Sequence, residues 1–237
     1  MNVLPRWSIV IPFKGAPHAK TRLAENFDSS TRAALAFALL TDTVLAVRAV
    51  PSVVRVVLVS NEPELLTTIL DEPSAAPRMG GRPAGAELTI VADPADSGDG
   101  LNAAVSHGIR HARKLDDRAF TAALVGDVAA LRPDDLAYAL DEAVARFRAG
   151  SALAMVADRD GTGTTMITAA PGARIEPRFG LGSSAAHQAA GHVLLPVPGE
   201  SSLRLDIDSA EDLRRAISLD PGLGAATRRV VARGPNG

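Results

Sequence analysis

Short runs of almost unbroken apolar residues alternate along the chain with longer segments of helical periodicity. Five such runs each end in a polar or glycine-containing turn: Trp7–Phe13, Val53–Ser60, Leu88–Ala92, Ala122–Val125 and Ala152–Val156. Continuous apolar strands of this length, separated by helices, are typical of a parallel sheet that is covered on both faces. The pattern therefore predicts an α/β fold with a doubly wound, Rossmann-like core.

Helical patterns fill the connections between these runs. The first predicted helix has Ser29 or Ser30 as its N-cap and apolar residues at helical spacing up to Val47. Similar patterns predict helices over Ala103–Leu115 and Asp134–Ala149. The first two-thirds of the chain is thus a series of alternating strands and helices, which favours a mostly parallel central sheet with helices on both faces.

The order of elements changes after residue 150. Leu153–Asp158 and Thr164–Ala170 are two predicted strands without room for a helix between them, which indicates a hairpin-like or crossover insertion. A short alanine-rich helix, a short strand over Leu203–Ile207 and a last helix from Ser209 are expected to follow.

Composition narrows the class of protein. The 237 residues include no cysteine, which excludes disulfide scaffolds and thiolate zinc sites, and the formal net charge is -2. This charge gives no general attraction to nucleic acid or to anionic membranes, and no stretch approaches the ~18 consecutive apolar residues of a membrane span. We expect a cytoplasmic protein with one domain over residues 1–232, a disordered tail over residues 233–237, and neither a nucleic-acid nor a membrane partner.

A cationic loop follows the first predicted strand and carries Lys14, Lys20 and Arg22. In open α/β sheets, ligands bind outside the carboxyl ends of the strands, where this loop lies. The loop matches neither the P-loop pattern nor the dinucleotide-binding glycine pattern. We therefore expect the three side chains to bind the phosphates of a nucleotide by charge, and Gly100 and Asn102, in the turn before the next helix, to face its base.

Carboxylates end two of the predicted strands. Asp127 follows one apolar run, and Asp206 and Asp208 end another, where they share a face because alternate residues of an extended segment point the same way. Carboxylates beside a phosphate-binding loop are suitable ligands for Mg²⁺. The three acids are the predicted metal ligands, although Asp208 can also belong to a helix cap, since residues 209–212 form a capping-box pattern.

Two small, hydroxyl-rich turns lie in the second half of the chain, over residues 161–165 and 178–184. The second turn directly precedes a predicted helix, whose N-terminus offers free amide donors and the positive end of the helix dipole. We interpret the two turns as an anion pocket for an acceptor distinct from the nucleotide. The alternative is that both are only tight turns.

Six segments, taken in order, resemble the guanylyltransferases of deazaflavin coenzyme biosynthesis, which act on 2-phospho-L-lactate or phosphoenolpyruvate. The similarity runs from about residue 8 to residue 219, and the stretch Arg178-Phe179-Gly180 is most similar to the actinobacterial members, for which phosphoenolpyruvate is the implied acceptor. The segments are Lys14–Leu23, Asp99–Ala104, Gly126-Asp127, Asp158–Thr164, Arg178–Ser184 and Asp206–Asp208.

The resemblance implies a single domain of the glycosyltransferase-A, or nucleotide-diphosphosugar-transferase, type. It implies that Lys20 holds the triphosphate and acts in catalysis together with Asp127. The implied magnesium ligands, for two ions, are Asp127, Asp206 and Asp208, and the implied acceptor-binding residues are Thr164, Gly180 and Ser183.

One departure concerns the turn after Asp127. The family usually continues Gly-Asp with Leu-Pro, whereas Val128 and Ala129 follow here. Loss of the proline is expected to loosen this turn and to leave the carboxylate in place.

The implied reaction joins GMP from GTP to the phosphate of a small phosphorylated carboxylic acid and releases pyrophosphate. A phosphate monoester has its second pKa near ~6, so the acceptor is already largely dianionic at neutral pH and needs no general base. Hand-over of a labile product to the next pathway enzyme is a further expectation. The rival interpretations are a nucleotidyltransferase with another acceptor, such as a sugar phosphate, phosphoglycerate or molybdopterin, and a catalytically silent nucleotide-binding module.

Overall fold

The computed structural model of the chain describes most of the sequence. The predicted nucleotide-binding residues Lys20 and Arg22 lie outside the described residues, whereas Lys14 lies within them. The described residues are 4–15, 27–70, 78–79, 82–83, 85–94, 100–219 and 222–233.

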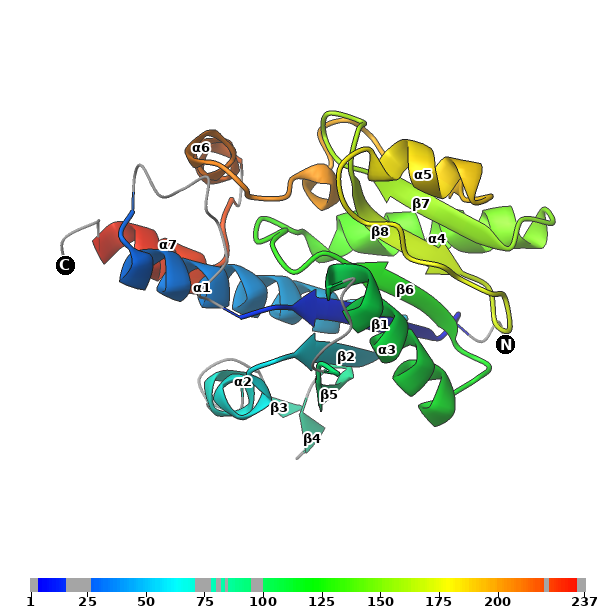
Figure 1. Cartoon of the computed structure of the whole chain (residues 1–237), viewed down its shortest axis with the longest axis horizontal. Helices are drawn as coiled ribbons and strands as arrows, with labels where there is room; N and C mark the ends of the chain where they lie inside the picture. The colour runs from blue at the N-terminus through cyan, green and yellow to red at the C-terminus, as the bar shows by residue number, and fades with distance from the viewer. Residues whose placement is uncertain are drawn as a thin grey trace.

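A seven-stranded sheet forms the centre of the molecule, in the order β5-β2-β1-β6-β8-β7-β9 (Figure 1). The first four strands in this order are parallel, and β8 runs antiparallel to both of its neighbours. A separate antiparallel pair is formed by β3 and β4. The bounds are β1 (Trp7–Phe13), β2 (Val53–Ser60), β3 (Arg78–Met79), β4 (Arg82–Pro83), β5 (Glu87–Ala92), β6 (Phe120–Leu124), β7 (Leu153–Ala157), β8 (Thr164–Ala169) and β9 (Val193–Leu194).

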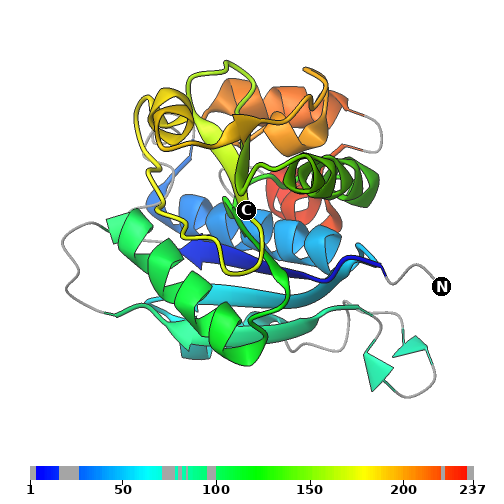
Figure 2. The same ribbon diagram turned by 90° about the vertical axis from the view of Figure 1, so that its right-hand side faces the viewer.

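Helices cover both faces of this sheet, as the sequence predicts. Alternate residues of β1 face opposite ways: Ile9 packs into a core with α1, α2 and α4, and Val10 packs into a second core with α3. Figure 2 shows α1 and α3 on opposite sides of the sheet. The bounds are α1 (Ser29–Arg48), α2 (Pro63–Leu70), α3 (Gly100–Leu115), α4 (Pro133–Arg148), α5 (Ser183–Ala189), α6 (Ala210–Ser218) and α7 (Ala225–Arg233).

Helix α1 has the length and apolar composition that would allow it to cross a membrane, the one such helix found in the described part of the chain. In this fold its apolar side chains lie in the interior. Leu40 and Val44 are fully buried against the sheet, and Leu39 is buried in a third core with the C-terminal segment. The apolar character of α1 is therefore explained by its position as a core helix.

A buried carboxylate joins α1 to α7, which lie side by side in Figure 1. Asp42 of α1 accepts hydrogen bonds from the backbone N–H groups of Ala226 (3.0 Å) and Thr227 (2.7 Å), in the first turn of α7. A side chain at Gly224 would collide with this carboxylate, since its Cβ would meet Asp42 Cγ. This contact holds the C-terminal segment against α1.

Three details of the sequence prediction are wrong. The N-cap of α1 is Asp28, whose carboxylate accepts a hydrogen bond from the Thr31 N–H (2.7 Å), and not Ser29 or Ser30. The predicted strand over Leu203–Ile207 is instead a short 3-10 helix, η2 (Ser202–Arg204), followed by an irregular segment. Arg233, expected in the tail, is the last residue of α7, and residues 234–237 lie outside the described part of the chain.

Candidate functional site

The predicted metal ligands come together where β6 ends. The backbone N–H of Ile207 donates a hydrogen bond to the carbonyl of Asp127 (3.1 Å), which places the segment after η2 beside the end of β6. Leu205 and Ile207 are buried in the third core, whereas Asp206 and Asp208 are half-buried. The alternation expected of an extended segment is thus present although no strand forms, and both acids lie on the face away from that core.

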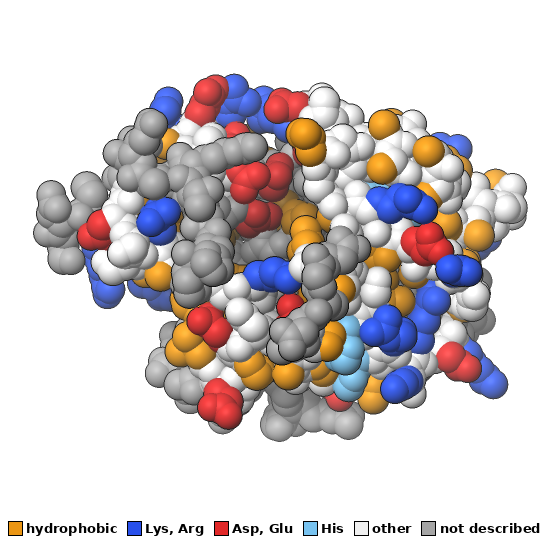
Figure 3. All heavy atoms as spheres, in the orientation of Figure 1, with side chains coloured by type: hydrophobic (Ala, Val, Ile, Leu, Met, Phe, Trp, Pro, Cys, Tyr) orange, Lys and Arg blue, Asp and Glu red, His pale blue; other side chains and the backbone are white. Residues whose placement is uncertain are grey.

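A cleft of about 530 Å³ opens at this point. Acidic side chains gather in a hollow of the face shown in Figure 3. Among the described residues, six carboxylates and two guanidinium groups line the cleft, and together they give it a negative field: Asp127, Asp158, Asp160, Asp206, Asp208, Asp212, Arg159 and Arg215. A triphosphate and a phosphorylated acid would be repelled here unless a cation accompanied them.

Asp206 is costly to ionise in this cleft. Burial, followed by the charges of Asp127 and Asp208 and more weakly that of Asp158, raises the pKa of Asp206 to about 7. Both causes act against the charged form, because burial removes water and each neighbouring carboxylate adds repulsion. A bound cation would reverse this balance, and such a perturbed carboxyl in a cleft is typical of a functional site.

The donor set fits magnesium. Mg²⁺ is usually bound by one or two carboxylates together with waters and substrate phosphates. Across the described residues no group of three or more His, Cys, Asp or Glu side chains is placed so that it could hold an ion by itself, so magnesium at this point would also need water and substrate phosphates as ligands. Asp158 Oδ1 is also buried in the cleft wall and has no hydrogen-bond partner among the described residues. This oxygen of Asp158 is therefore available to a cation in the cleft.

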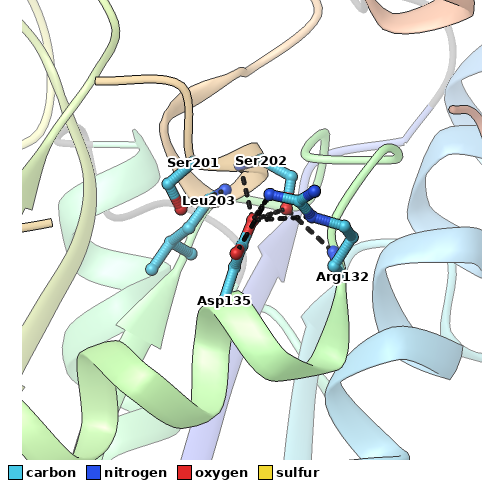
Figure 4. Close-up of polar contacts among 5 residues, drawn as sticks. All are labelled: Arg132, Asp135, Ser201, Ser202 and Leu203. Carbon is cyan, nitrogen blue, oxygen red and sulfur yellow. Dashed lines mark hydrogen bonds and ion pairs between the residues drawn. The ribbon is translucent and has the colours of Figure 1, made fainter. Parts of the chain in front are cut away.

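A polar network fixes η2, the 3-10 helix that precedes Asp206 and Asp208, to the N-terminal end of α4 (Figure 4). Asp135, in the first turn of α4, accepts hydrogen bonds from the N–H (2.7 Å) and the hydroxyl (2.5 Å) of Ser202 in η2. Arg132 completes the network, since its N–H donates to the Ser202 hydroxyl (2.9 Å) and its guanidinium pairs with Asp135 (2.9 Å). Burial opposes ionisation of Asp135, but the bonds from Ser202 and Arg132 outweigh it and lower the pKa of this carboxyl.

The turn between β7 and β8 forms the next part of the cleft. The carboxylate of Asp158 accepts a hydrogen bond from the Gly163 N–H (2.8 Å), and the Asp158 carbonyl accepts one from the Arg204 guanidinium (2.8 Å). A Cβ at Gly163 would collide with Asp158 Oδ2, so this position needs glycine for close approach. Arg204 thereby ties η2 to this turn.

The predicted acceptor-binding residues line the opposite wall of the same cleft. Thr164 begins β8, Ser183 begins α5, and Gly180 lies in the preceding turn with φ of 131°, a conformation that favours glycine. The Ser183 N–H donates to the Gly180 carbonyl (3.1 Å), and the Ser184 N–H donates to the Thr162 carbonyl (3.1 Å). The two hydroxyl-rich turns, which lie apart in the sequence, are therefore one wall.

His187, which the sequence analysis did not single out, lies behind this wall. It is fully buried, its Nδ1 lies 3.0 Å from Thr164 Oγ1, and its Nε2 accepts a hydrogen bond from the Arg178 N–H (2.9 Å). Its ring meets Phe179 edge-on at 5.2 Å and His192 at 5.1 Å. No spacing in the sequence points to this residue, because its partners are 9 and 23 positions away.

The predicted nucleotide-binding residues are only partly assembled in the described structure. Lys14 follows the last residue of β1, its Nζ lies 3.7 Å from Asp93 Oδ2, and a Cβ at Gly100 would lie 3.1 Å from that Nζ. Asn102 does not face open space: its amide exchanges two hydrogen bonds with the backbone of Phe179, at 2.7 and 3.1 Å. It thereby ties α3 to the cleft wall formed by the turns over residues 161–165 and 178–184, the predicted acceptor wall. The sequence position of Asn102 does not reveal this contact.

The turn after Asp127 is held without a proline. Val128 and Ala129 are buried in two different cores. The Leu131 N–H donates to the Val128 carbonyl (2.8 Å), and the Gly224 N–H donates to the Ala129 carbonyl (3.1 Å). Packing and hydrogen bonds thus supply the restraint that a proline would have given.

Comparisons with known proteins agree with this architecture. No family model matches the chain. The chain is similar to the phosphoenolpyruvate guanylyltransferases of Sanguibacter keddieii (40% identity, covering 91% of this chain and 81% of that protein) and Streptomyces coelicolor (38%, covering 96% and 97%). Among solved structures, it superposes on a protein classed as a nucleotide-diphospho-sugar transferase from Desulfovibrio desulfuricans G20 with a TM-score of 0.62, at 15% identity over 97% of this chain and 95% of that one. This structural likeness confirms the predicted fold.

Proposed function

The chain belongs to the phosphoenolpyruvate guanylyltransferase family, and we propose that it joins GMP from GTP to the phosphate of phosphoenolpyruvate and releases pyrophosphate. One observation carries this proposal beyond the family relationship. Three acids, Asp127, Asp206 and Asp208, face a wall of hydroxyl and glycine residues across one cleft at the edge of the sheet. Such a cleft can hold two anionic substrates side by side.

In the proposed reaction, a phosphate oxygen of phosphoenolpyruvate attacks the α-phosphorus of GTP. A new phosphorus–oxygen bond forms, the bond from the α-phosphorus to the oxygen that bridges to the β-phosphate breaks, and pyrophosphate leaves with the bonding electrons. The acceptor phosphate is already largely dianionic at neutral pH, so no side chain has to remove a proton. The catalytic contribution of the protein is positioning and charge compensation.

The acid side of the cleft would bind the cation. Asp127, Asp206 and Asp208 would hold magnesium, for which two ions are the expectation from the sequence. When bound, magnesium would neutralise charge on the reacting phosphates. Ionised Asp206 would bind it best, so cation binding and loss of the Asp206 proton are coupled.

The opposite side would bind the acceptor. Thr164 and Ser183 offer hydroxyl donors to its anionic groups, and Gly180 lets the backbone approach closely. Lys14 would contribute to nucleotide binding from the end of β1. We retain Lys20, Arg22, Gly100 and Asn102 as proposed nucleotide-binding residues, and Lys20 also as a catalytic one; the direct contribution of Asn102 to base binding competes with its bonds to Phe179. Cytoplasmic location and hand-over of the product remain predictions.

An assay of pyrophosphate release tests the proposal. Each of the four ribonucleoside triphosphates is combined with phosphoenolpyruvate, 2-phospho-L-lactate or phosphoglycerate, in magnesium and in excess chelator. We expect release with GTP and phosphoenolpyruvate in magnesium and none in chelator. No release from GTP with any acceptor would contradict the guanylyltransferase proposal, and release undiminished by chelator would contradict the metal assignment. A preference for another acceptor would change the proposed acceptor and leave the proposed class of reaction unchanged.

A further inference from the structure

A buried chain of hydrogen bonds leads from the backbone at Arg178 through His187 to Thr164, in the wall of the cleft. His187 is fully buried and Thr164 nearly so. The Arg178 N–H lies 2.9 Å from His187 Nε2, and His187 Nδ1 lies 3.0 Å from Thr164 Oγ1. The ring therefore connects a fixed backbone donor to the side chain of a residue that lines the cleft.

The direction of these bonds follows from the first one. A backbone N–H can only donate, so His187 Nε2 must accept and carries no hydrogen. A neutral imidazole has its single hydrogen on the other nitrogen, so Nδ1 donates to Thr164 Oγ1. Burial, and then the neighbouring His192 and Arg178, lower the pKa of His187 to about 4; a hydrogen bond with the Ser183 backbone opposes this shift without cancelling it, and the result is consistent with the neutral ring.

This direction determines what Thr164 can offer to a ligand. Its oxygen already accepts a hydrogen bond from the ring, so its own hydrogen is available to donate toward the cleft. An anion requires donors, and a hydroxyl that instead donated to the ring would turn a lone pair toward the anion and repel it.

We propose that His187 is a positioning residue that makes the Thr164 hydroxyl an obligate hydrogen-bond donor to the anionic acceptor in the cleft. This inference rests on the proposed function, because it specifies how the acceptor wall recognises an anion. The same ring also holds the Arg178–Phe179 backbone, which Asn102 holds from α3. The two contacts of the ring can be separated by substitution.

Two amide variants separate them. His187→Asn keeps a donor at the position of Nδ1 and loses the acceptor at Nε2, whereas His187→Gln keeps an acceptor near Nε2 and loses the donor to Thr164. We expect His187→Gln to raise KM for phosphoenolpyruvate about tenfold while KM for GTP stays unchanged. His187→Asn should raise KM for phosphoenolpyruvate less than His187→Gln does, even if its melting temperature falls further, because it keeps the donor to Thr164 and loses only the contact with the Arg178 backbone. A rise of both KM values to the same extent in both variants would overturn the proposal, because it would indicate a merely structural role.

A double-mutant cycle tests whether the effect passes through the hydroxyl. Thr164→Val removes the hydroxyl at nearly constant volume, and Thr164→Ser, which keeps it, is the matched control. We expect Thr164→Val to raise KM for phosphoenolpyruvate about as much as His187→Gln does, and His187→Gln to add nothing further when combined with Thr164→Val. A full additional increase in the double variant would overturn the proposal.

The tautomer can be measured without activity. In the full chain labelled with ¹⁵N-histidine, the imidazole resonances that disappear in His187→Gln belong to His187. We expect these resonances to show a protonated Nδ1 and an unprotonated Nε2 at neutral pH; a protonated Nε2 would overturn the proposal. If the wild-type chain has this tautomer but releases no pyrophosphate with any acceptor, the proposed function is refuted. The role of His187 would then be decided by the affinity for phosphoenolpyruvate, which we expect both Thr164→Val and His187→Gln to weaken.

Discussion

The acids and the hydroxyl-bearing residues line the same cleft but are built on opposite principles. On one side, Asp127, Asp206 and Asp208 are held together by the backbone and repel one another. On the other, Thr164 and Ser183 are neutral, and Thr164 is already engaged by His187. In the proposed function a cation would complete the first side, whereas hydrogen bonds within the protein order the second.

Burial is the leading cause of the pKa shifts on both sides, with opposite signs. It raises the pKa of Asp206 to about 7 and lowers that of His187 to about 4, so in each case it favours the neutral form. Asp206 therefore carries less charge at neutral pH than an exposed aspartate would. We infer that Asp206 becomes fully ionised when a cation binds, while His187 stays neutral throughout.

Replacing one acid of the cleft should have the largest effect on activity. Asp127→Asn should lower kcat for pyrophosphate release at least about a hundredfold, because a metal ligand supports several kcal/mol of transition-state stabilisation. The melting temperature should change little. Asp141→Asn, the same substitution at an exposed position of α4, is the matched control and should keep full activity. Near-normal activity of purified Asp127→Asn would remove Asp127 from the metal site.

Removing the hydrogen bonds that hold η2 to Asp135 should have the next largest effect. Asp135→Ala leaves the buried N–H and hydroxyl of Ser202 without their acceptor, so we expect a loss of about 3 kcal/mol in the free energy of unfolding. Activity should fall with it, since this network holds the segment that carries Asp206. Asp134→Ala, one residue earlier and exposed, should cost about 0.5 kcal/mol. Equal losses in denaturant unfolding of the two variants would contradict this role of Asp135.

Gly163→Ala tests the turn between the two sides. The added methyl group must displace the Asp158 carboxylate and break its bond to the Gly163 N–H, at a cost of about 1 to 2 kcal/mol. Gly199→Ala is the control, because a Cβ there meets nothing within 4 Å. Urea unfolding of both variants measures the difference, and a Gly163→Ala protein as stable as Gly199→Ala would show that the turn adjusts freely.

The smallest expected effect is a pH-dependent difference in stability that comes from Asp206. The folded pKa of Asp206 lies above its unfolded value near ~3.9, so the stability linked to its proton is present below about pH 4 and is lost as pH rises through about 7. Asp206→Asn mimics the protonated form. Without divalent cations, we expect it to exceed the wild type in stability by about 1 kcal/mol at pH 8 and by much less at pH 5. Melting curves that differ equally at both pH values would argue against the shifted pKa.

The parallel part of the fold could be predicted from sequence with high fidelity. The apolar runs at β1 and β2 match their strands to the residue, because a strand buried on both faces leaves an almost continuous apolar run. Leu203–Ile207 shows why the same reasoning failed later in the chain. Its alternating apolar residues are buried as a strand's would be, but Ser202 bonds to the Asp135 side chain and Ile207 makes only a single backbone bond to Asp127.

The sequence allowed prediction of those candidate site residues whose side-chain type alone indicates their chemistry. Asp127, Asp206 and Asp208 could be proposed because each follows an apolar residue or run in the sequence, and the structure brings all three to one cleft. His187 and the role of Asn102 could not, because both act through contacts with the backbone of residues 178–179, which lie 9 and 77 positions away. Such contacts depend on how α3 and α5 converge, and no local pattern encodes that convergence.

The reversed direction of β8 has a consequence for how this enzyme class can change. Because β8 is antiparallel to β6, its first residue, Thr164, lies at the same edge of the sheet as the last residues of β6. The acceptor wall therefore belongs to one continuous stretch, residues 158–192, that lies beside the parallel half of the sheet. If this stretch binds the acceptor as we propose, we expect its replacement to change the acceptor that is used, while the parallel strands that precede Lys14 and Asp127 keep their sequence.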